Sequence, residues 1–216
     1  MQIPLKTLER IAQIYEKHGL NDSEKPSDAG KGYWQPTPFE VLNMETKSLF
    51  VQQYLGKLKH AGKALVAGAG DGRRALYLSQ LGYDQVVGVE LNPDLVASGN
   101  HIKELAAAQG LIDPKKITLV QGDFLDDRVY QKLGLHFSDF NFISAYLLKS
   151  NFEKLAGKFE EEAKKETVLY ATQPVDFDFK DSKINLQEQV IGILQGNKYT
   201  HRSMHIYTLP NLATKR

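Results

Sequence analysis

The chain has 216 residues, 42% of them hydrophobic, and a formal net charge of only +1 at pH 7. This length fits one domain with an N-terminal extension, and the balanced charge gives no overall basic surface for nucleic acid. The lack of cysteine excludes disulfides, thiolate metal sites and cysteine nucleophiles. No apolar run approaches the roughly 18 residues of a membrane span, and the N-terminus reads as an amphipathic helix, so we expect a cytoplasmic protein.

The first third of the chain predicts helices separated by a polar loop. Residues 4–19 place apolar side chains at helical spacing, and the polar segment 21–32, which contains glycine and proline, predicts a mobile loop. A second helix is expected near 39–59. We therefore divide the chain into an N-terminal helix and loop over 1–32 and a main domain over 33–216.

From residue 63 onward, short apolar runs alternate with helical patterns. We expect strands at 63–67, 85–90, 116–121, 139–145 and 167–172, and helices at 72–81, 93–109, 126–133 and 150–165. Two more strand-like runs, 189–194 and 204–209, flank Gly196-Asn197, which favours a hairpin. The predicted fold is an α/β, doubly wound, seven-stranded and mostly parallel sheet with an antiparallel C-terminal hairpin.

The segment 63–94 has the order of a nucleotide-binding unit: a strand, a glycine loop, a helix and a second strand. The loop reads Gly68-Ala69-Gly70-Asp71-Gly72, and its three glycines let the backbone turn sharply and approach a ligand. Glu90 ends the second strand, where its carboxylate can accept hydrogen bonds from both hydroxyls of a ribose. The alternative interpretation of Glu90 is a solvated strand end.

A second acidic position follows the third predicted strand. In a doubly wound sheet, ligands lie outside the carboxyl ends of the strands. Asp123 can therefore accept a hydrogen bond from an adenine amino group, while Phe124 or Leu91 packs on the ring. The alternative interpretation of Asp123 is an N-cap for a helix that starts near Leu125.

Two cofactor classes use such a layout. Dinucleotide dehydrogenases carry G-x-G-x-x-G, whose last glycine permits tight packing of the helix on the strand. Arg73 occupies that sixth position here. A nicotinamide-dependent oxidoreductase is therefore the least favoured of the functions considered.

The ordered motifs resemble the class I, Rossmann-like methyltransferases that use S-adenosylmethionine, over roughly residues 33–209. AGAGDGR resembles their first motif, VGVELNPDLV their second and QGDFLD their third. The segments YWQPTPFEVL and SAYLL are similar, more narrowly, to non-SET protein-lysine methyltransferases and their microbial relatives.

This resemblance implies a methyltransferase that binds S-adenosylmethionine and acts on an unidentified acceptor, a protein lysine, another amine or a small molecule. It implies cofactor contacts from the glycine loop, Glu90, Leu91, Asp123 and Phe124, and further ones from Thr37 and Ala145. No catalytic residue is assigned, but Tyr146 and Tyr33, together with Trp34, are candidates for an aromatic wall beside an acceptor amine. The three aromatic residues could equally be packing residues, and Thr37 could equally be a helix N-cap.

One residue departs from the family pattern. Val66 stands where the family usually has an acid that helps to order the loop and the methionine end of the cofactor. A second hypothesis is therefore a partner-binding module with this fold and weak or no activity. His201 and His205 are four residues apart, but no carboxylate nearby completes a set, so no metal site is predicted. Neither a membrane nor a nucleic acid partner is indicated.

Overall fold

The computed structural model describes residues 5–20, 37, 39, 42, 62–171, 184–195 and 198–209. The chain forms two compact units, Met1–Asp123 and Phe124–Arg216. The helix expected near 39–59, the loop 21–32, the pair Tyr33 and Trp34 and the turn Gly196-Asn197 fall outside the described residues, apart from Phe39 and Leu42. Within the part of the chain that is described, no helix has both the length and the apolar character needed to cross a bilayer.

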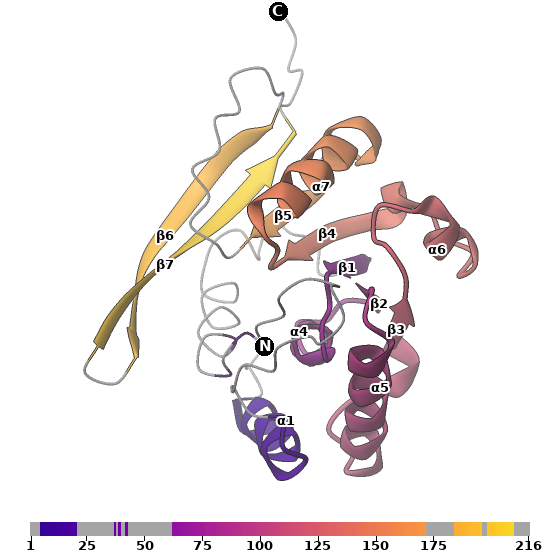
Figure 1. Cartoon of the computed structure of the whole chain (residues 1–216), viewed down its shortest axis with the longest axis vertical. Coiled ribbons are helices and arrows are strands. Elements are labelled where there is room, and N and C mark those ends of the chain that lie inside the picture. The colour runs from indigo at the N-terminus through magenta and orange to yellow at the C-terminus, as the bar shows by residue number, and fades with distance from the viewer. Residues whose placement is uncertain are drawn as a thin grey trace, which may run out of the picture. The chain divides into compact units, whose positions relative to one another are not determined.

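The described residues of the first unit form three parallel strands and helices before, between and beside them in the chain (Figure 1). Strand β2 pairs with β1 on one side and with β3 on the other. The elements are α1 (Leu5–Lys17), β1 (Lys63–Ala67), α4 (Arg73–Ser79), β2 (Gln85–Glu90), α5 (Pro93–Ala108), the short 3-10 helix η1 (Pro114–Lys116) and β3 (Ile117–Gln121). The parallel order brings the carboxyl ends of β1, β2 and β3 to one edge, where the predicted glycine loop, Glu90 and Asp123 follow.

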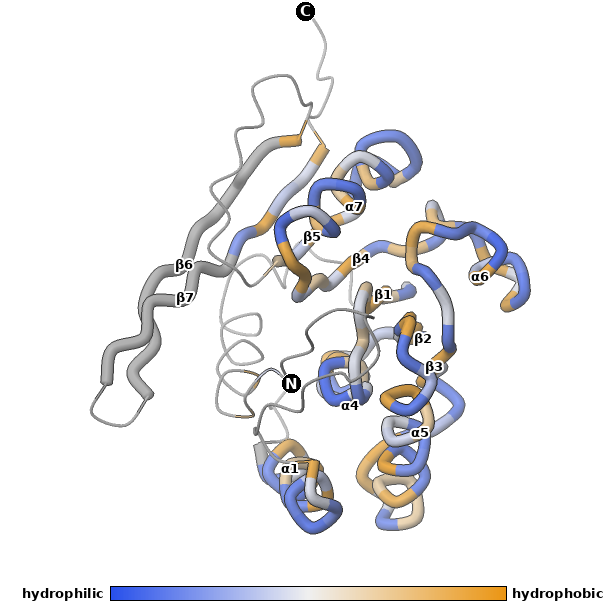
Figure 2. The backbone as a smooth tube through the Cα atoms, viewed as in Figure 1, coloured by the Kyte–Doolittle hydropathy of each residue, from blue (hydrophilic) through white to orange (hydrophobic). Residues whose placement is uncertain are grey.

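Helix α1 is amphipathic, as its spacing predicted. Leu8, Ile11, Ile14 and Tyr15 are buried, whereas the residues between them are mostly exposed and polar. Figure 2 shows hydrophobic and hydrophilic residues alternating along this helix. Burial of one apolar face stabilises a helix of this length, which would be marginal in isolation.

Helix α5 begins with a capping arrangement that fixes where strand β2 ends. Asn92 is the N-cap, its side-chain oxygen accepts a hydrogen bond from the Asp94 backbone N–H (2.9 Å), and Pro93 occupies the first helical turn. A proline there loses nothing, because the first-turn N–H groups have no partner within the helix. Only Leu91 and Asn92 therefore separate Glu90, the end of β2, from the start of α5.

The second unit contains a mixed sheet. Its elements are α6 (Asp127–Gln131), the 3-10 helix η2 (Phe137–Asp139), β4 (Phe140–Ala145), α7 (Lys149–Glu162), β5 (Val168–Ala171), β6 (Asn185–Gln195) and β7 (Lys198–Thr208). Strands β4 and β5 are parallel, and β7 lies antiparallel between β5 and β6. Phe142, Phe152, Phe159 and Tyr207 are almost completely buried and form much of its core.

The structure confirms the α/β class and the mixed, mostly parallel sheet with an antiparallel C-terminal hairpin. The two hairpin strands are longer than the sequence predicted, since β6 spans 185–195 rather than 189–194 and β7 spans 198–208 rather than 204–209. The added residues are mostly polar, and an antiparallel ladder needs only backbone hydrogen bonds, so no apolar run marks its ends. The pairing of Gln195 with Lys198 confirms the expected tight connection.

Candidate functional site

The glycine loop between β1 and α4 adopts a conformation that glycine permits. Gly68, Gly70 and Gly72 have φ angles of 69°, 56° and 77°, in the left-handed region that side chains disfavour. The N–H groups of Gly68 and Ala69 both donate to the Val89 carbonyl on β2, at 3.0 and 2.9 Å. The loop is thus fastened to the carboxyl end of the neighbouring strand.

Space is as restrictive as the backbone angle at the end of this loop. A Cβ atom on Gly72 would lie 2.5 Å from Cδ1 of Leu119 on β3. A side chain there would force the Leu119 side chain to shift. Gly72 therefore brings the start of α4 close against the sheet.

Glu90 joins the loop to the second predicted binding position. Its Oε2 accepts a hydrogen bond from the Gly70 N–H and its Oε1 accepts one from the Asn92 N–H, each at 2.9 Å. The side chain is half-buried. These contacts make Glu90 more than a solvated strand end, and each carboxylate oxygen keeps a second lone pair that a hydroxyl could use.

Asp123 is exposed beyond the end of β3 and does not cap a helix. The N-cap of α6 is Asp126, whose side chain accepts a hydrogen bond from the Arg128 N–H (3.0 Å), so the capping interpretation of Asp123 is wrong. The hydrogen bonds from Arg128 also lower the pKa of Asp126. Position 126 captures the cap because it lies directly before the first helical residue.

Of the two residues expected beside an adenine ring, one is accessible. Leu91 follows Glu90 directly and is 51% exposed, a high value for a leucine, whereas Phe124 is 6% exposed. An exposed leucine between two polar positions provides an apolar surface that a ring could cover. The exposures therefore favour Leu91 for this contact in the first unit.

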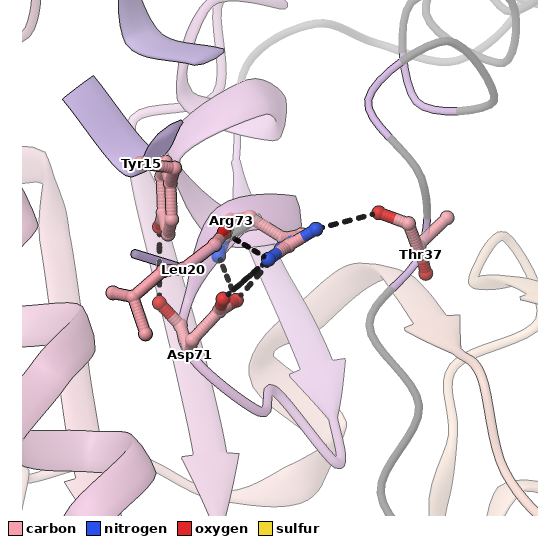
Figure 3. A network of polar contacts seen from close by, with 5 residues as sticks. All are labelled: Tyr15, Leu20, Thr37, Asp71 and Arg73. Atoms are coloured by element: carbon pink, nitrogen blue, oxygen red, sulfur yellow. Dashed lines mark hydrogen bonds and ion pairs between the residues drawn. The ribbon is translucent and has the colours of Figure 1, made fainter. Parts of the chain in front are cut away.

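The structure adds a buried ion pair inside the loop that the sequence did not predict (Figure 3). The Arg73 guanidinium donates to both carboxylate oxygens of Asp71, at distances from 2.7 to 3.1 Å, and both side chains are almost completely buried. The same guanidinium donates to the carbonyl of Thr37 (3.0 Å) and to that of Leu20 (2.9 Å). Arg73 thus joins the loop to two earlier stretches of the chain.

The N-terminal helix meets the same pair from another side. The Arg73 guanidinium lies 4.5 Å from the ring centre of Phe39 and 5.3 Å from that of Tyr15. The Tyr15 hydroxyl donates to the Asp71 carbonyl (3.0 Å), and burial raises the pKa of Tyr15 well above its ordinary 10.0, so the phenol keeps the proton that it donates. A Cβ atom on Gly99 of α5 would lie 2.7 Å from that carbonyl oxygen. Helices α1, α4 and α5 therefore all contact Asp71.

Thr37 is buried between two arginines. Its hydroxyl oxygen accepts a hydrogen bond from the Arg74 guanidinium (3.2 Å), and its carbonyl accepts the one from Arg73. The predicted contact of Thr37 with a cofactor carboxylate stays a prediction. The Arg74 guanidinium places positive charge beside the Thr37 hydroxyl.

The remaining predicted residues are placed as follows. Ala145 is buried at the end of β4 in the second unit, and Tyr146 after it is half-buried, so their proposed roles stay predictions. Val66 is buried within β1, with 1% exposed. His205 is buried on β7 with its ring stacked on Tyr207, and the described residues contain no cluster of three or more side chains that could hold a metal ion.

Three residues of the site escaped the sequence-based prediction for identifiable reasons. Arg73 was interpreted only as a missing glycine, and its acceptors lie 36 and 53 residues away at Thr37 and Leu20. Gly99 carried a usable sign, because a glycine inside a helical pattern often marks close packing. Tyr15 looked like an ordinary apolar position of an amphipathic helix.

No protein-family model matches the chain, and no curated protein matches it. Solved structures do match it. An RNA methyltransferase from Salinibacter ruber, in complex with S-adenosyl-L-homocysteine, is 22% identical, with a TM-score of 0.56 over 84% of this chain and 97% of that one. An O-methyltransferase from Bacillus cereus, also in complex with S-adenosyl-L-homocysteine, is 15% identical, with a TM-score of 0.62 over 95% and 91%. A putative RNA methyltransferase from Pyrococcus horikoshii is 14% identical, with a TM-score of 0.59 over 95% and 98%.

The chain has the Rossmann-like fold of the class I methyltransferases. The resemblance noted in the sequence is confirmed at the level of the fold. The matches cover nearly the whole length of the three similar structures. Position 66, where the sequence comparison expected an acid, is the apolar and buried Val66. Asp71 lies in the loop, and Glu90 accepts a hydrogen bond from it. The names of these three structures give no support to a protein lysine as the acceptor.

Proposed function

We propose that the protein is an S-adenosylmethionine-dependent methyltransferase with an acceptor still to be identified. The observation that carries the proposal is the carboxylate of Glu90, held by the Gly70 and Asn92 N–H groups beside a left-handed glycine loop. The fold shared with methyltransferase structures supports it, two of which contain S-adenosyl-L-homocysteine. The strand order of the second unit, with antiparallel β7 between β5 and β6, matches the C-terminal hairpin expected for this class.

The residues present fit the cofactor. Glu90 retains lone pairs for the two ribose hydroxyls, and Gly68 and Gly70 bring the loop backbone close without a Cβ atom in the way. Leu91 offers an exposed apolar surface to the adenine ring, and Asp123 an acceptor for its amino group. Thr37, with the Arg74 guanidinium beside it, would meet the carboxylate of the methionine end.

Bound S-adenosylmethionine would supply an activated methyl group, so the chain mainly needs to align the acceptor and exclude water. Tyr146, directly after β4, and Tyr33 are the residues to which we assign acceptor contacts, and Ala145 at the end of β4 is assigned to the cofactor. The proposal includes a doubly wound, seven-stranded sheet and a cytoplasmic location, as expected from the sequence. For the acceptor we favour RNA or a small molecule over a protein lysine, in line with the names of the similar structures.

Calorimetric titration with S-adenosylhomocysteine tests the proposal. The wild-type protein should bind, and Glu90→Ala should weaken binding by about tenfold or more, because hydrogen bonds to a charged group contribute about 1.5–3 kcal/mol. Glu104→Ala is the matched control, since that carboxylate is exposed on α5 and removed from the loop. No heat from the wild-type protein at millimolar ligand would refute cofactor binding. If a reduced nicotinamide dinucleotide quenched the fluorescence of the protein instead, the oxidoreductase alternative would be favoured.

A second candidate, a binding module without catalysis, has one observation in its favour. Val66 is buried and apolar at the position where the class usually carries an acid. A radiolabelled methyl-transfer assay over fractionated lysate separates the two candidates. Transfer to any protein, RNA or metabolite would exclude the binding module, and the labelled fraction would give the acceptor class.

A further inference from the structure

The glycine loop is held in place by a part of the chain that precedes it by many residues. We define the N-terminal segment as helix α1 together with Leu20 and Thr37. Three hydrogen bonds join this segment to the loop: from the Tyr15 hydroxyl to the Asp71 carbonyl, and from Arg73 to the carbonyls of Leu20 and Thr37. All five residues appear in Figure 3. The loop conformation therefore depends on groups outside the β1–α4–β2 unit that carries the glycines.

Only an arginine can make this set of contacts. Its planar guanidinium offers five N–H donors in a fixed fork, and here Nε and Nη2 engage Asp71, Nη1 engages Thr37 and Nη2 also reaches Leu20. A lysine ammonium is a compact charge on a flexible stem and cannot reach acceptors on three sides at once. Arg73 therefore performs a geometric task as well as an electrostatic one.

Burial makes these contacts cooperative. Arg73 is 2% exposed and Asp71 is completely buried, so a lost acceptor cannot be replaced by water without opening the packing around them. If Leu20 or Thr37 moves away, the guanidinium must either leave a donor unsatisfied or turn, and Asp71 must follow it. The ordered loop and the docked N-terminal segment are then two parts of one structural state.

The loop passes this constraint to the predicted cofactor contacts. Asp71 follows Gly70 directly, and the N–H of Gly70 binds the carboxylate of Glu90, the predicted ribose acceptor. A shift of Asp71 changes the position of Gly70, and with it the hydrogen bond that orients Glu90. The connection from Tyr15 to Glu90 thus runs through two hydrogen bonds and one peptide bond.

We propose that Arg73 is a positioning residue that couples the N-terminal segment to the glycine loop, so that docking of this segment sets the affinity for the cofactor. The identity of the ligand rests on the proposed function. In this arrangement Asp71, held by Arg73, orders the loop in a chain whose position 66 is apolar. Because linkage is reciprocal, bound S-adenosylhomocysteine must also stabilise the docked state of α1.

A matched pair of tyrosine variants tests the coupling. Tyr15→Phe removes the hydroxyl that donates to Asp71, and Tyr77→Phe removes a hydroxyl that donates to the Leu8 carbonyl of the same helix α1 (3.1 Å). Both rings are completely buried and stay in place in the variants, so both changes remove a buried hydrogen bond that holds α1. The hydroxyl removed by the first change donates to the loop, and the one removed by the second donates to α1.

We expect Tyr15→Phe to raise the dissociation constant of S-adenosylhomocysteine roughly fivefold, and Tyr77→Phe to change it by less than about twofold, at similar loss of stability in urea. Hydrogen exchange should quicken at the amides of residues 68–73 in Tyr15→Phe only. Equal weakening of binding in both variants, or in neither, would overturn the proposal, because binding would then follow overall stability or be independent of the N-terminal segment.

Arg73→Lys supplies a second test that keeps the positive charge. We expect it to weaken binding by about tenfold or more, and to make Tyr15→Phe nearly silent when the two are combined, because residues in one network are not additive. Full additivity of the two changes would contradict the coupling.

The exchange experiment distinguishes the two proposals. If the wild-type protein binds no S-adenosylhomocysteine, the proposed function fails, but faster exchange of residues 68–73 in Tyr15→Phe and Arg73→Lys would still support the positioning role. If the wild-type protein binds and neither variant changes loop exchange or affinity, the positioning role fails and the proposed function stands. In the wild-type protein, the ligand should also slow exchange in α1, and unchanged exchange there would contradict the reciprocal coupling.

Discussion

The two units of the molecule each contain a buried cation that holds helices in place, and the two cations have different surroundings. Arg73 pairs with Asp71, which is fully buried, and also donates hydrogen bonds to the backbone carbonyls of Thr37 and Leu20. In the second unit, the Lys158 ammonium pairs with Asp127 (2.6 Å) and Glu162 (2.7 Å) and lies 5.0 Å from the ring centre of Phe137. The Asp127 and Glu162 side chains are 53% and 36% exposed.

This contrast separates a contact that fixes a conformation from one that joins two surfaces. If Lys158 is removed, water can solvate the exposed carboxylates of Asp127 and Glu162, so the protein loses little stability. If Arg73 is removed, the Asp71 carboxylate is left buried without a counter-charge. Water cannot reach this carboxylate unless the loop rearranges. The position of the acid therefore decides the consequence, although both bases are buried.

The largest expected effect is that of Arg73→Met. It should lower the free energy of unfolding by about 3–5 kcal/mol, because it leaves a buried charge uncompensated. Urea unfolding followed by circular dichroism measures it. The double variant Arg73→Met with Asp71→Asn should recover part of the loss. If the second change makes the protein still less stable, the cost does not arise from the stranded carboxylate.

The next largest effect is expected from the helix that closes on Asp71. Gly99→Ala would place a Cβ 2.7 Å from the Asp71 carbonyl oxygen, so we expect a loss of about 1–3 kcal/mol from overpacking. Gly157→Ala is the matched control on α7, where a Cβ would meet nothing within 4 Å. Helix propensity should make that variant more stable by about 1 kcal/mol. Equal responses of the two variants in thermal unfolding would mean that α5 does not press on the loop.

Lys158→Met should cost at most about 1 kcal/mol in the same assay, because the two carboxylates that pair with Lys158 are exposed to water. The comparison would break down if this loss matched that of Arg73→Met. Exposure of the acid would then not be the property that separates the two cations.

The smallest effect is the one that alkaline pH reveals. Burial opposes the charge of Lys158, but the hydrogen bonds that its ammonium donates to Asp127 and Glu162 outweigh burial and raise the pKa of Lys158 above 10.5. A raised pKa contributes stability that is complete below pH 10.5 and is lost as the pH rises through the value in the folded protein. The difference in unfolding free energy between wild type and Lys158→Met should therefore shrink above pH 10.5. The corresponding difference for Arg73→Met should persist, since a guanidinium stays charged there. A Lys158 difference that is constant up to the highest pH would contradict an ionic origin.

The sequence predicted the elements of the fold well because their patterns are local. The strands 63–67 and 85–90 were predicted at the residues where they are found, since continuous apolar runs and the glycine loop mark their bounds. The polar ends of β6 and β7 were missed, because an antiparallel ladder leaves no such mark. Glu90 was placed correctly beside the loop, since parallel strands end at one edge.

The network around Asp71 could not be predicted in the same way. Asp71 was selected as a loop residue, but nothing local indicates that its carboxylate turns inward to Arg73 or that its carbonyl receives a hydroxyl from Tyr15. These contacts join residues far apart in the sequence, and hydrophobic periodicity reports only which face of α1 is buried, not what lies against it. Gly99, inside a helical pattern, was a local sign of close packing near the loop.

The hydrogen bond from Tyr15 to Asp71 also has a consequence for synthesis of the chain. The two residues are 56 positions apart, so at about 5–20 residues per second the ribosome completes the partner of α1 roughly 3–11 s after the helix itself. During that interval much of the first unit is not yet synthesised, so Leu8, Ile11 and Ile14 cannot be buried as they are in the folded protein. The apolar face of α1 is then open to chaperones and to other nascent chains, and a pause in translation before Arg73 would lengthen that exposure.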